Sequence, residues 1–125
     1  MTTVIDWHAH HTAPEVAERI GQLTGKKPHI DAYDSPELSK RVKEMDEAGI
    51  DLQLVCQGAG IYADQLSAAQ ALEIMHQSND VLAQRIAPHQ DRLGGIVALS
   101  LKNIAESVLL DEYLRQLLLL CKFHY

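Results

Sequence analysis

The sequence predicts an α/β fold built on a parallel sheet. Segments with the character of strands and helices alternate in the order strand, helix, strand, helix, strand, helix. The third strand-like segment, residues 93–101, is almost wholly apolar, which is typical of a strand that is buried on both faces. The helical segments after the first two strands are long enough to carry the chain back across a sheet, so consecutive strands are expected to be parallel.

The first strand is expected to lead into a histidine-rich end. Residues 2–5 are β-branched and apolar, and residues 6–11 follow them directly. Pro14 opens a short helix that is predicted to end near residue 20. Residues 21–34 show no apolar periodicity, which predicts a long loop.

The next helix and strand are delimited by clear local signals. Ser35 and Pro36 are typical of a helix start, because the serine side chain can accept a hydrogen bond from a free backbone N–H and proline has none to satisfy. A helix is therefore predicted over residues 35–48, and Gly49 is expected to end it. Residues 50–57 (IDLQLVCQ) predict the second strand.

A longer helix is predicted over residues 65–87. Its apolar stripe recurs at spacings of four and three, and Asn79 is the polar member of that stripe. A buried asparagine must be hydrogen-bonded, so Asn79 is expected to tie this helix to a neighbouring loop or strand end. The strand over residues 93–101 follows, and a last helix is predicted over residues 103–120.

Composition excludes several classes of function. A chain of 125 residues with 46% hydrophobic residues can form one domain with its own core. The formal charge of -6 argues against nucleic acid as a partner. The sequence has no apolar run long enough to span a membrane and no signal peptide, so a cytoplasmic protein with reduced Cys56 and Cys121 is expected.

Asp6, His8 and His10 form the strongest chemical pattern. Alternate residues of a regular strand point to one side, so these three side chains are expected to share a face, with His11 on the other. Two imidazoles at this spacing can bind one divalent ion through ring nitrogens at about 2.0 to 2.1 Å. Asp6 is expected either to orient a ligand histidine or to contact the metal. A histidine pair that is merely hydrogen-bonded at a strand end is the alternative.

No convincing third ligand emerges from the sequence. The remaining candidates are His29, His76, His89, His124, Cys56 and several carboxylates. Cys56 ends the second strand and is interpreted as a small buried residue rather than a ligand.

Residues 58–63 fit a glycine-rich dinucleotide-binding pattern, G-x-G-x-x-A. That fingerprint needs an acidic residue at the end of the next strand, where this sequence has none, so a simple turn is favoured. Tyr62 in this turn is a candidate for contact with a substrate.

Three segments resemble one known family. VIDWHAHH (residues 4–11), MDEAGIDLQLV (45–55) and NDVLAQRIAPHQDRLGGIVALSL (79–101) resemble the amidohydrolase superfamily, in the branch that contains aminocarboxymuconate-semialdehyde decarboxylase. The resemblance implies a (β/α)8 TIM barrel with a divalent metal, usually zinc, held by His8 and His10 together with a histidine and an aspartate from later strands. It implies decarboxylation or hydrolysis of a small carboxylic acid.

A barrel of this type needs eight strands and roughly 250 residues. Residues 1–125 are therefore expected to form one partial barrel domain, truncated after the third strand and its helix. Such a fragment is expected to bind zinc weakly, to lack catalytic activity of its own, and to associate into homo-oligomers through open sheet edges. No catalytic acid or base is assigned. A non-catalytic remnant or association module is the alternative function.

Overall fold

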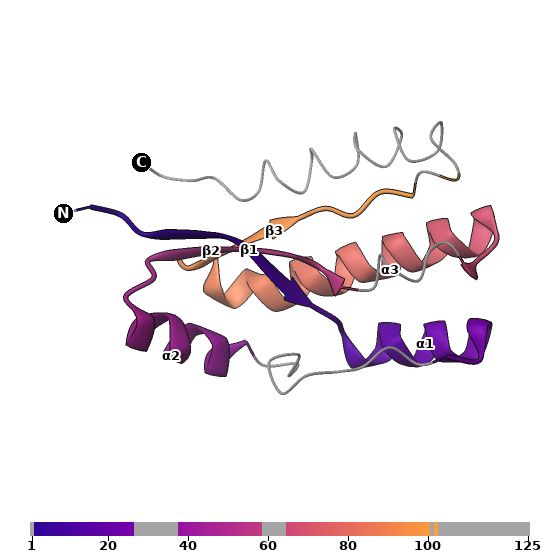
Figure 1. Ribbon diagram of the computed structural model, residues 1–125, viewed down its shortest axis with the longest axis horizontal. Helices are drawn as coiled ribbons and strands as arrows, with labels where there is room; N and C mark the ends of the chain where they lie inside the picture. Colours follow the sequence, from indigo (N-terminus) through magenta and orange to yellow (C-terminus); the bar gives the residue numbers. More distant parts are fainter. Residues whose placement is uncertain (1, 27–37, 59–64, 101, 103–125) are drawn as a thin grey trace.

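The computed structural model describes residues 2–26, 38–58, 65–100 and 102. Within these ranges the elements follow the predicted alternation of strands and helices (Figure 1). They are β1 (Ile5–His11), α1 (Pro14–Thr24), α2 (Ser39–Ala48), β2 (Leu52–Gln57), α3 (Ala68–Ile86), the short 3-10 helix η3 (Ala87–His89) and β3 (Leu93–Ile96). The last helix predicted from the sequence, over residues 103–120, lies outside the described residues.

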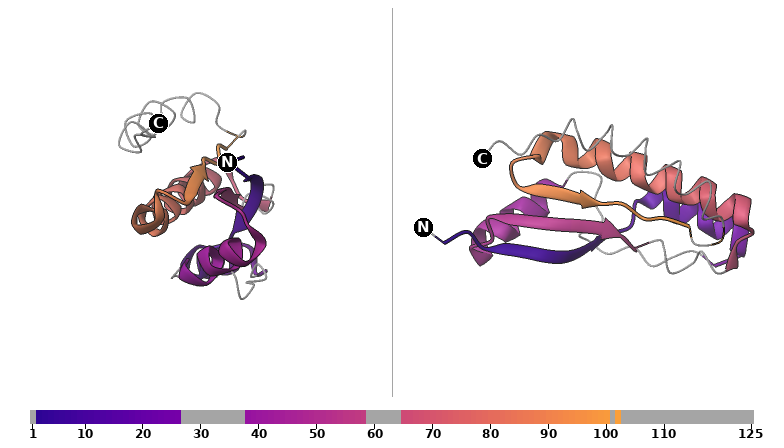
Figure 2. Two further views of the ribbon diagram at one scale, coloured as in Figure 1. Left: turned by 90° about the vertical axis from the view of Figure 1, so that its left-hand side faces the viewer. Right: turned by 90° about the horizontal axis from the view of Figure 1, so that it is seen from above.

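The three strands form one parallel sheet in the order β1, β2, β3 (Figure 2). This confirms the predicted strand order and direction. A βα barrel requires that each new strand is added on the same side of the previous one, whereas the strand order of a doubly wound sheet reverses direction at its centre. The carboxyl ends of β1 and β2 therefore lie next to each other, where parallel α/β folds build their sites.

One face of the sheet is covered by α2 and α3. Val55 of β2 is fully buried, and it packs in one cluster with residues of both helices and of β3. The cluster consists of Leu38, Met45, Val55, Leu82, Ile86 and Leu93. Both crossover helices therefore pack on a common side, as predicted, and this arrangement argues against the dinucleotide-binding alternative.

Helix α1 is longer than the sequence indicated. The predicted loop from residue 21 is wrong for residues 21–24, which continue the helix to Thr24. Leu23 packs against the cluster that α1 forms with α3, and this contact outweighs the weak local helix signal. Gly25 adopts a left-handed conformation with φ 73° and ends the helix.

The ends of the other two helices have identifiable causes. Gly49 ends α2 with φ 69°, as predicted. Ser67 caps α3 by accepting from the backbone N–H of Gln70, while the Gln70 side chain accepts from the backbone N–H of Ser67. This capping box starts α3 at Ala68, later than the predicted residue 65. The predicted start signal of α2, Ser35 with Pro36, lies outside the described residues.

Strand β3 is shorter than predicted because Asn79 takes over its backbone groups. The Asn79 side chain donates to the carbonyl of Ala98 at 2.9 Å and accepts from the N–H of Ala98 at 3.0 Å. Ala98 therefore bonds to α3 rather than to a neighbouring strand, and β3 ends at Ile96. Asn79 is 4% exposed, so the prediction that it ties α3 to a strand end is confirmed. None of the described helices is both long and apolar enough to cross a membrane.

Candidate metal centre

His8 and His10 lie on the open face of β1, opposite the helices. His10 pairs in register with Cys56 of β2, whereas Ala9 pairs with Val55, which points into the helix-covered core. The rings of His8 and His10 meet edge to face with their centroids 4.7 Å apart. The prediction that these two side chains project to the same side is confirmed.

The register of β1 shifts between Asp6 and Ala9, where three steps of β1 match two steps of β2. Such a bulge breaks the alternation of side chains. Asp6 consequently pairs with Gln53, and its Oδ2 accepts from Gln53 Nε2 at 2.6 Å. The expectation that Asp6 shares a face with the two histidines was therefore wrong.

Asp6 still acts on the histidine segment, but through the backbone. Its Oδ1 accepts from the backbone N–H of His8 at 3.3 Å. The carboxylate thus connects the bulge to Gln53, which is only 8% exposed. Its contacts in the described part of the chain position the main chain of β1 rather than a histidine ring.

A buried network supports β1 from the helix side. Arg41 of α2 is 8% exposed, and its Nη1 donates to Gln53 Oε1 at 2.9 Å. Its Nη2 donates to the carbonyl oxygen of His10 at 2.7 Å. Together with the bond from Gln53 to Asp6, this network holds both ends of the segment that carries the histidines. The side chains of His8 and His10 therefore stand on a backbone that is held from the helix side.

His11 points away from the pair, as predicted, and is fully buried. Its Nε2 lies 2.7 Å from Nη1 of Arg85 on α3, and that guanidinium also holds both carboxylate oxygens of Glu15 at 2.7 and 2.8 Å. Because arginine stays protonated, His11 Nε2 must be the acceptor in this contact. His11 therefore anchors the end of β1 to α3 and takes no part in the exposed pair.

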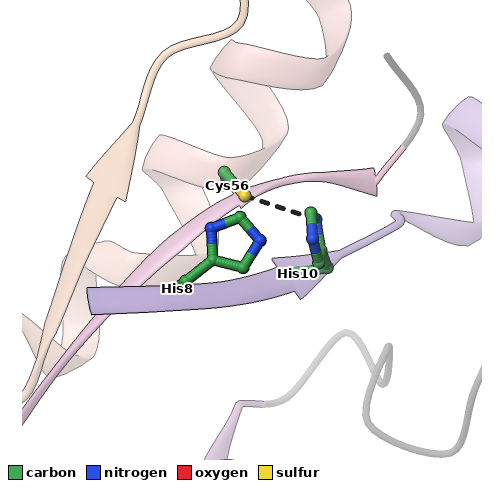
Figure 3. Close-up of side chains that lie close together, drawn as sticks. All are labelled: His8, His10 and Cys56. Carbon is green, nitrogen blue, oxygen red and sulfur yellow. Dashed lines mark hydrogen bonds between the residues drawn. The ribbon is translucent and has the colours of Figure 1, made fainter. Parts of the chain in front are cut away.

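Cys56 joins the two histidines at the carboxyl end of β2 (Figure 3). Its Sγ lies 3.3 Å from His10 Nδ1, and one ligand atom from each of His8, His10 and Cys56 lies within 4.8 Å of the others. The expectation that Cys56 is only a small buried residue missed this proximity. The signal that could have shown it is position, because Cys56 ends a strand parallel and adjacent to the strand of the histidines.

The Cys56 thiol has a partly buried environment. Burial raises its pKa above the ordinary value for cysteine, and a backbone hydrogen bond opposes that shift. Its Sγ also donates to the carbonyl oxygen of Ala9 at 3.2 Å. Cys56 is a free thiol and forms no disulfide. The raised pKa favours the thiol over the thiolate.

These donor atoms fit a divalent metal ion. In a tetrahedral zinc site, a nitrogen and a sulfur ligand atom stand about 3.5 to 3.6 Å apart. The distance of 3.3 Å between Cys56 Sγ and His10 Nδ1 is already close to that separation. His8 is exposed, so its ring can rotate closer to Cys56 and His10 without moving the core. Among the described residues, His8, His10 and Cys56 form the group of three histidine, cysteine or carboxylate side chains whose ligand atoms lie close enough to share one ion.

Gly58 follows β2 at the edge of this site. A Cβ atom at this position would overlap Oγ1 of Thr12, so a larger residue would force the Thr12 side chain to move. This contact gives the first glycine of the glycine-rich pattern a structural reason. Tyr62, the predicted substrate-side residue, lies outside the described residues.

Comparison with known protein families finds no match to this sequence, and no curated protein matches it. Solved structures do match. 5-Carboxyvanillate decarboxylase from Sphingomonas paucimobilis superposes with a TM-score of 0.71 at 17% identity over 90% of this chain. A 2,6-dihydroxybenzoate decarboxylase in complex with 2,6-dihydroxybenzoate has a TM-score of 0.66 at 26% identity over 94% of this chain.

A dihydroxybenzoic acid decarboxylase from Polaromonas, solved with bound manganese and the inhibitor 2-nitroresorcinol, matches with a TM-score of 0.54 at 25% identity over 79% of this chain. The chain spans 39%, 37% and 30% of the lengths of these three proteins. The chain therefore has the fold of the first βα units of a TIM-barrel amidohydrolase, and the resemblance predicted from its sequence is confirmed for that N-terminal portion.

Proposed function

We propose that this chain forms the N-terminal part of a divalent-metal-dependent decarboxylase or hydrolase that acts on a small, aromatic carboxylic acid. The observation that carries the proposal is the convergence of His8 and His10 at the carboxyl end of β1. This end of the strands is where barrel enzymes place their chemistry. The likeness to decarboxylases of 5-carboxyvanillate and 2,6-dihydroxybenzoate supports the choice of reaction and substrate class.

The metal is proposed to be held by His8 and His10. When bound, a divalent ion would supply a positive charge that orients and polarises a carboxylate substrate. Manganese in the Polaromonas decarboxylase supports a divalent cofactor, while the sequence resemblance favours zinc. The residues beneath the site have a separate task, because Arg41 and Gln53 keep the backbone of the histidine segment from shifting when an anion arrives.

Residues 1–125 are proposed to act as a single partial barrel domain that has no turnover by itself. Catalysis of this kind needs an acid or base within hydrogen-bond reach of the substrate. The carboxylate nearest in sequence, Asp6, is engaged with Gln53 on the other side of the strand. The chain is proposed to be a cytoplasmic protein.

A second candidate function, association without catalysis, is supported by apolar side chains at the strand ends and edges. Trp7 is 72% exposed and Ile5 is 51% exposed on β1, while Ile96 is 38% exposed on β3. Exposed strand edges with apolar side chains favour pairing with another chain. On this alternative, the 125-residue chain forms homo-oligomers, and light scattering would show a mass above that of the monomer whether or not metal is present.

The proposed function is tested by metal binding and turnover on the same preparation. The wild-type chain is titrated with Zn²⁺ and Mn²⁺ beside the His8→Ala, His10→Ala double variant, with His89→Ala as a matched control outside the cluster. Decarboxylation of 2,6-dihydroxybenzoate is assayed for each. We expect the double variant alone to lose metal binding, and none of the proteins to release carbon dioxide. Equal metal binding by the double variant and the wild type would refute the proposed centre.

A further inference from the structure

We propose that Cys56 is a third protein ligand of this metal centre, which makes the site a His2Cys site selective for zinc over manganese. The inference rests on the proposed function for the presence of a metal at His8 and His10. It goes beyond that function because it assigns a ligand on β2 and names the metal that the donor set prefers.

The parallel pairing of β1 and β2 provides the first argument. His10 and Cys56 are direct register partners, so their side chains leave the sheet side by side on the same face. The resulting separation of 3.3 Å between Cys56 Sγ and His10 Nδ1 is close to that between two corners of a tetrahedral site. This spacing is set by the backbone of two paired strands rather than by flexible loops, so little ordering is needed when an ion binds.

His8 provides the third corner. Its imidazole is exposed, and its ring stands edge to face with that of His10. The ligand atoms of the three residues span up to 4.8 Å, which is wider than the edge of a tetrahedron of ligands. A rotation of the exposed His8 side chain would close this gap, since Cys56 and His10 already lie next to each other as register partners.

A purely structural role for Cys56 predicts different behaviour. In the metal-free protein the thiol donates to the carbonyl oxygen of Ala9, and serine could replace it in that contact. When a metal binds, the S–H bond breaks, the sulfur forms a bond to the cation, and the proton leaves to solvent. Cys56→Ser therefore keeps the size and the hydrogen bond but removes the soft donor.

The sulfur donor determines the choice of metal. Thiolate ligands favour zinc, whereas manganese is best matched by carboxylate, carbonyl and water oxygens. Two imidazoles and a thiolate give this part of the chain three protein ligands, the number found in a catalytic zinc site. Removal of the sulfur should therefore weaken zinc binding strongly and manganese binding only slightly.

The test compares Cys56→Ser and Cys56→Ala with the wild-type chain and with the His8→Ala, His10→Ala double variant. Cys121→Ser is the matched control for loss of a thiol, and circular dichroism checks that every variant is folded. Zinc affinity is measured by chelator competition, manganese affinity by titration, and Co²⁺ is added as a spectroscopic probe. Quenching of Trp7, the sole tryptophan, reports Co²⁺ occupancy, because its ring lies 5.6 Å from that of His8.

We expect the wild type and Cys121→Ser to show a thiolate-to-cobalt charge-transfer band in the near ultraviolet, and both Cys56 variants to lack it. Their zinc affinity should fall at least about 100-fold, since even residues that only support a ligand change affinity by 10 to 100-fold. Unchanged zinc affinity in folded Cys56 variants, with binding lost only in the double histidine variant, would overturn this inference and leave the proposed function standing. Full binding by the double variant would instead remove both.

Discussion

The two faces of the sheet differ in how far their side chains are buried. On the helix-covered face, Val55 is fully buried and Gln53 is hydrogen-bonded at both ends of its amide. On the open face, His8 and His10 are exposed and Cys56 is only partly covered. Adjacent residues of one strand thus serve two purposes. The covered face fixes the backbone. The open face presents side-chain nitrogen and sulfur atoms that are not buried in the core and can contact a bound ion.

The largest effect is expected from loss of the buried arginine that supports β1 from the helix side. Arg41→Ala removes the bonds to Gln53 and to the His10 carbonyl, and leaves both buried acceptors without these donors. The free energy of unfolding should fall by about 3 kcal/mol. Urea denaturation measures it. Lys43→Ala on the exposed side of α2 is the control and should change stability by less than about 0.5 kcal/mol.

If Arg41→Ala were as stable as the control, the network of Arg41, Gln53 and Asp6 would not support β1. The covered face would then not be what fixes the backbone of the histidine segment. A second consequence can be measured on the same variant. Zinc affinity should also fall, because the His10 backbone would no longer be held in place.

A pair of neighbouring substitutions on β2 compares the faces directly. Val55→Ala should lower the free energy of unfolding by about 2 kcal/mol, because it leaves a cavity in the packed cluster. Leu54→Ala lies on the open face, where its side chain is only half-buried, and should cost less than about 1 kcal/mol. The two values come from the same denaturation experiment. Equal losses would mean that the open face is covered by other parts of the protein.

The smallest effect concerns the rate at which Cys56 reacts. Because burial raises the pKa of its thiol, less thiolate is present at neutral pH, and iodoacetamide should label Cys56 more slowly than free cysteine. Raising the pH should speed the reaction. Zinc should slow it further by occupying the sulfur. Peptide mass spectrometry separates Cys56 from Cys121, and labelling of Cys56 as fast as free cysteine would contradict the described environment.

The sequence was sufficient where local patterns decide the structure. Strand order followed from alternating segments, and the shared side of His8 and His10 followed from strand periodicity. Asn79 was recognised because a polar residue in an apolar helix stripe must find a partner, and it bonds to Ala98. In each case the relevant physical rule acts over a few neighbouring residues.

The sequence was insufficient where distant segments meet. The bulge that turns Asp6 toward Gln53 depends on how β1 is paired with β2, 47 residues away in the chain. The approach of Cys56 to His10 depends on the same register. The extension of α1 and the early end of β3 follow from packing and from one side-chain contact. The sequence was therefore sufficient to propose His8 and His10 as ligands of the centre. The third proposed ligand, Cys56, was recognised only from the structure.

X-ray absorption at the zinc edge of the zinc-loaded chain tests the central claim most directly. The account predicts two imidazole nitrogens at about 2.0 to 2.1 Å, with the outer-shell scattering of histidine rings, and one sulfur at about 2.3 Å. The sulfur signal should disappear in Cys56→Ala and the imidazole signal in the His8→Ala, His10→Ala double variant. A spectrum of the wild-type protein with oxygen neighbours and no imidazole scattering would contradict a metal centre at the end of β1.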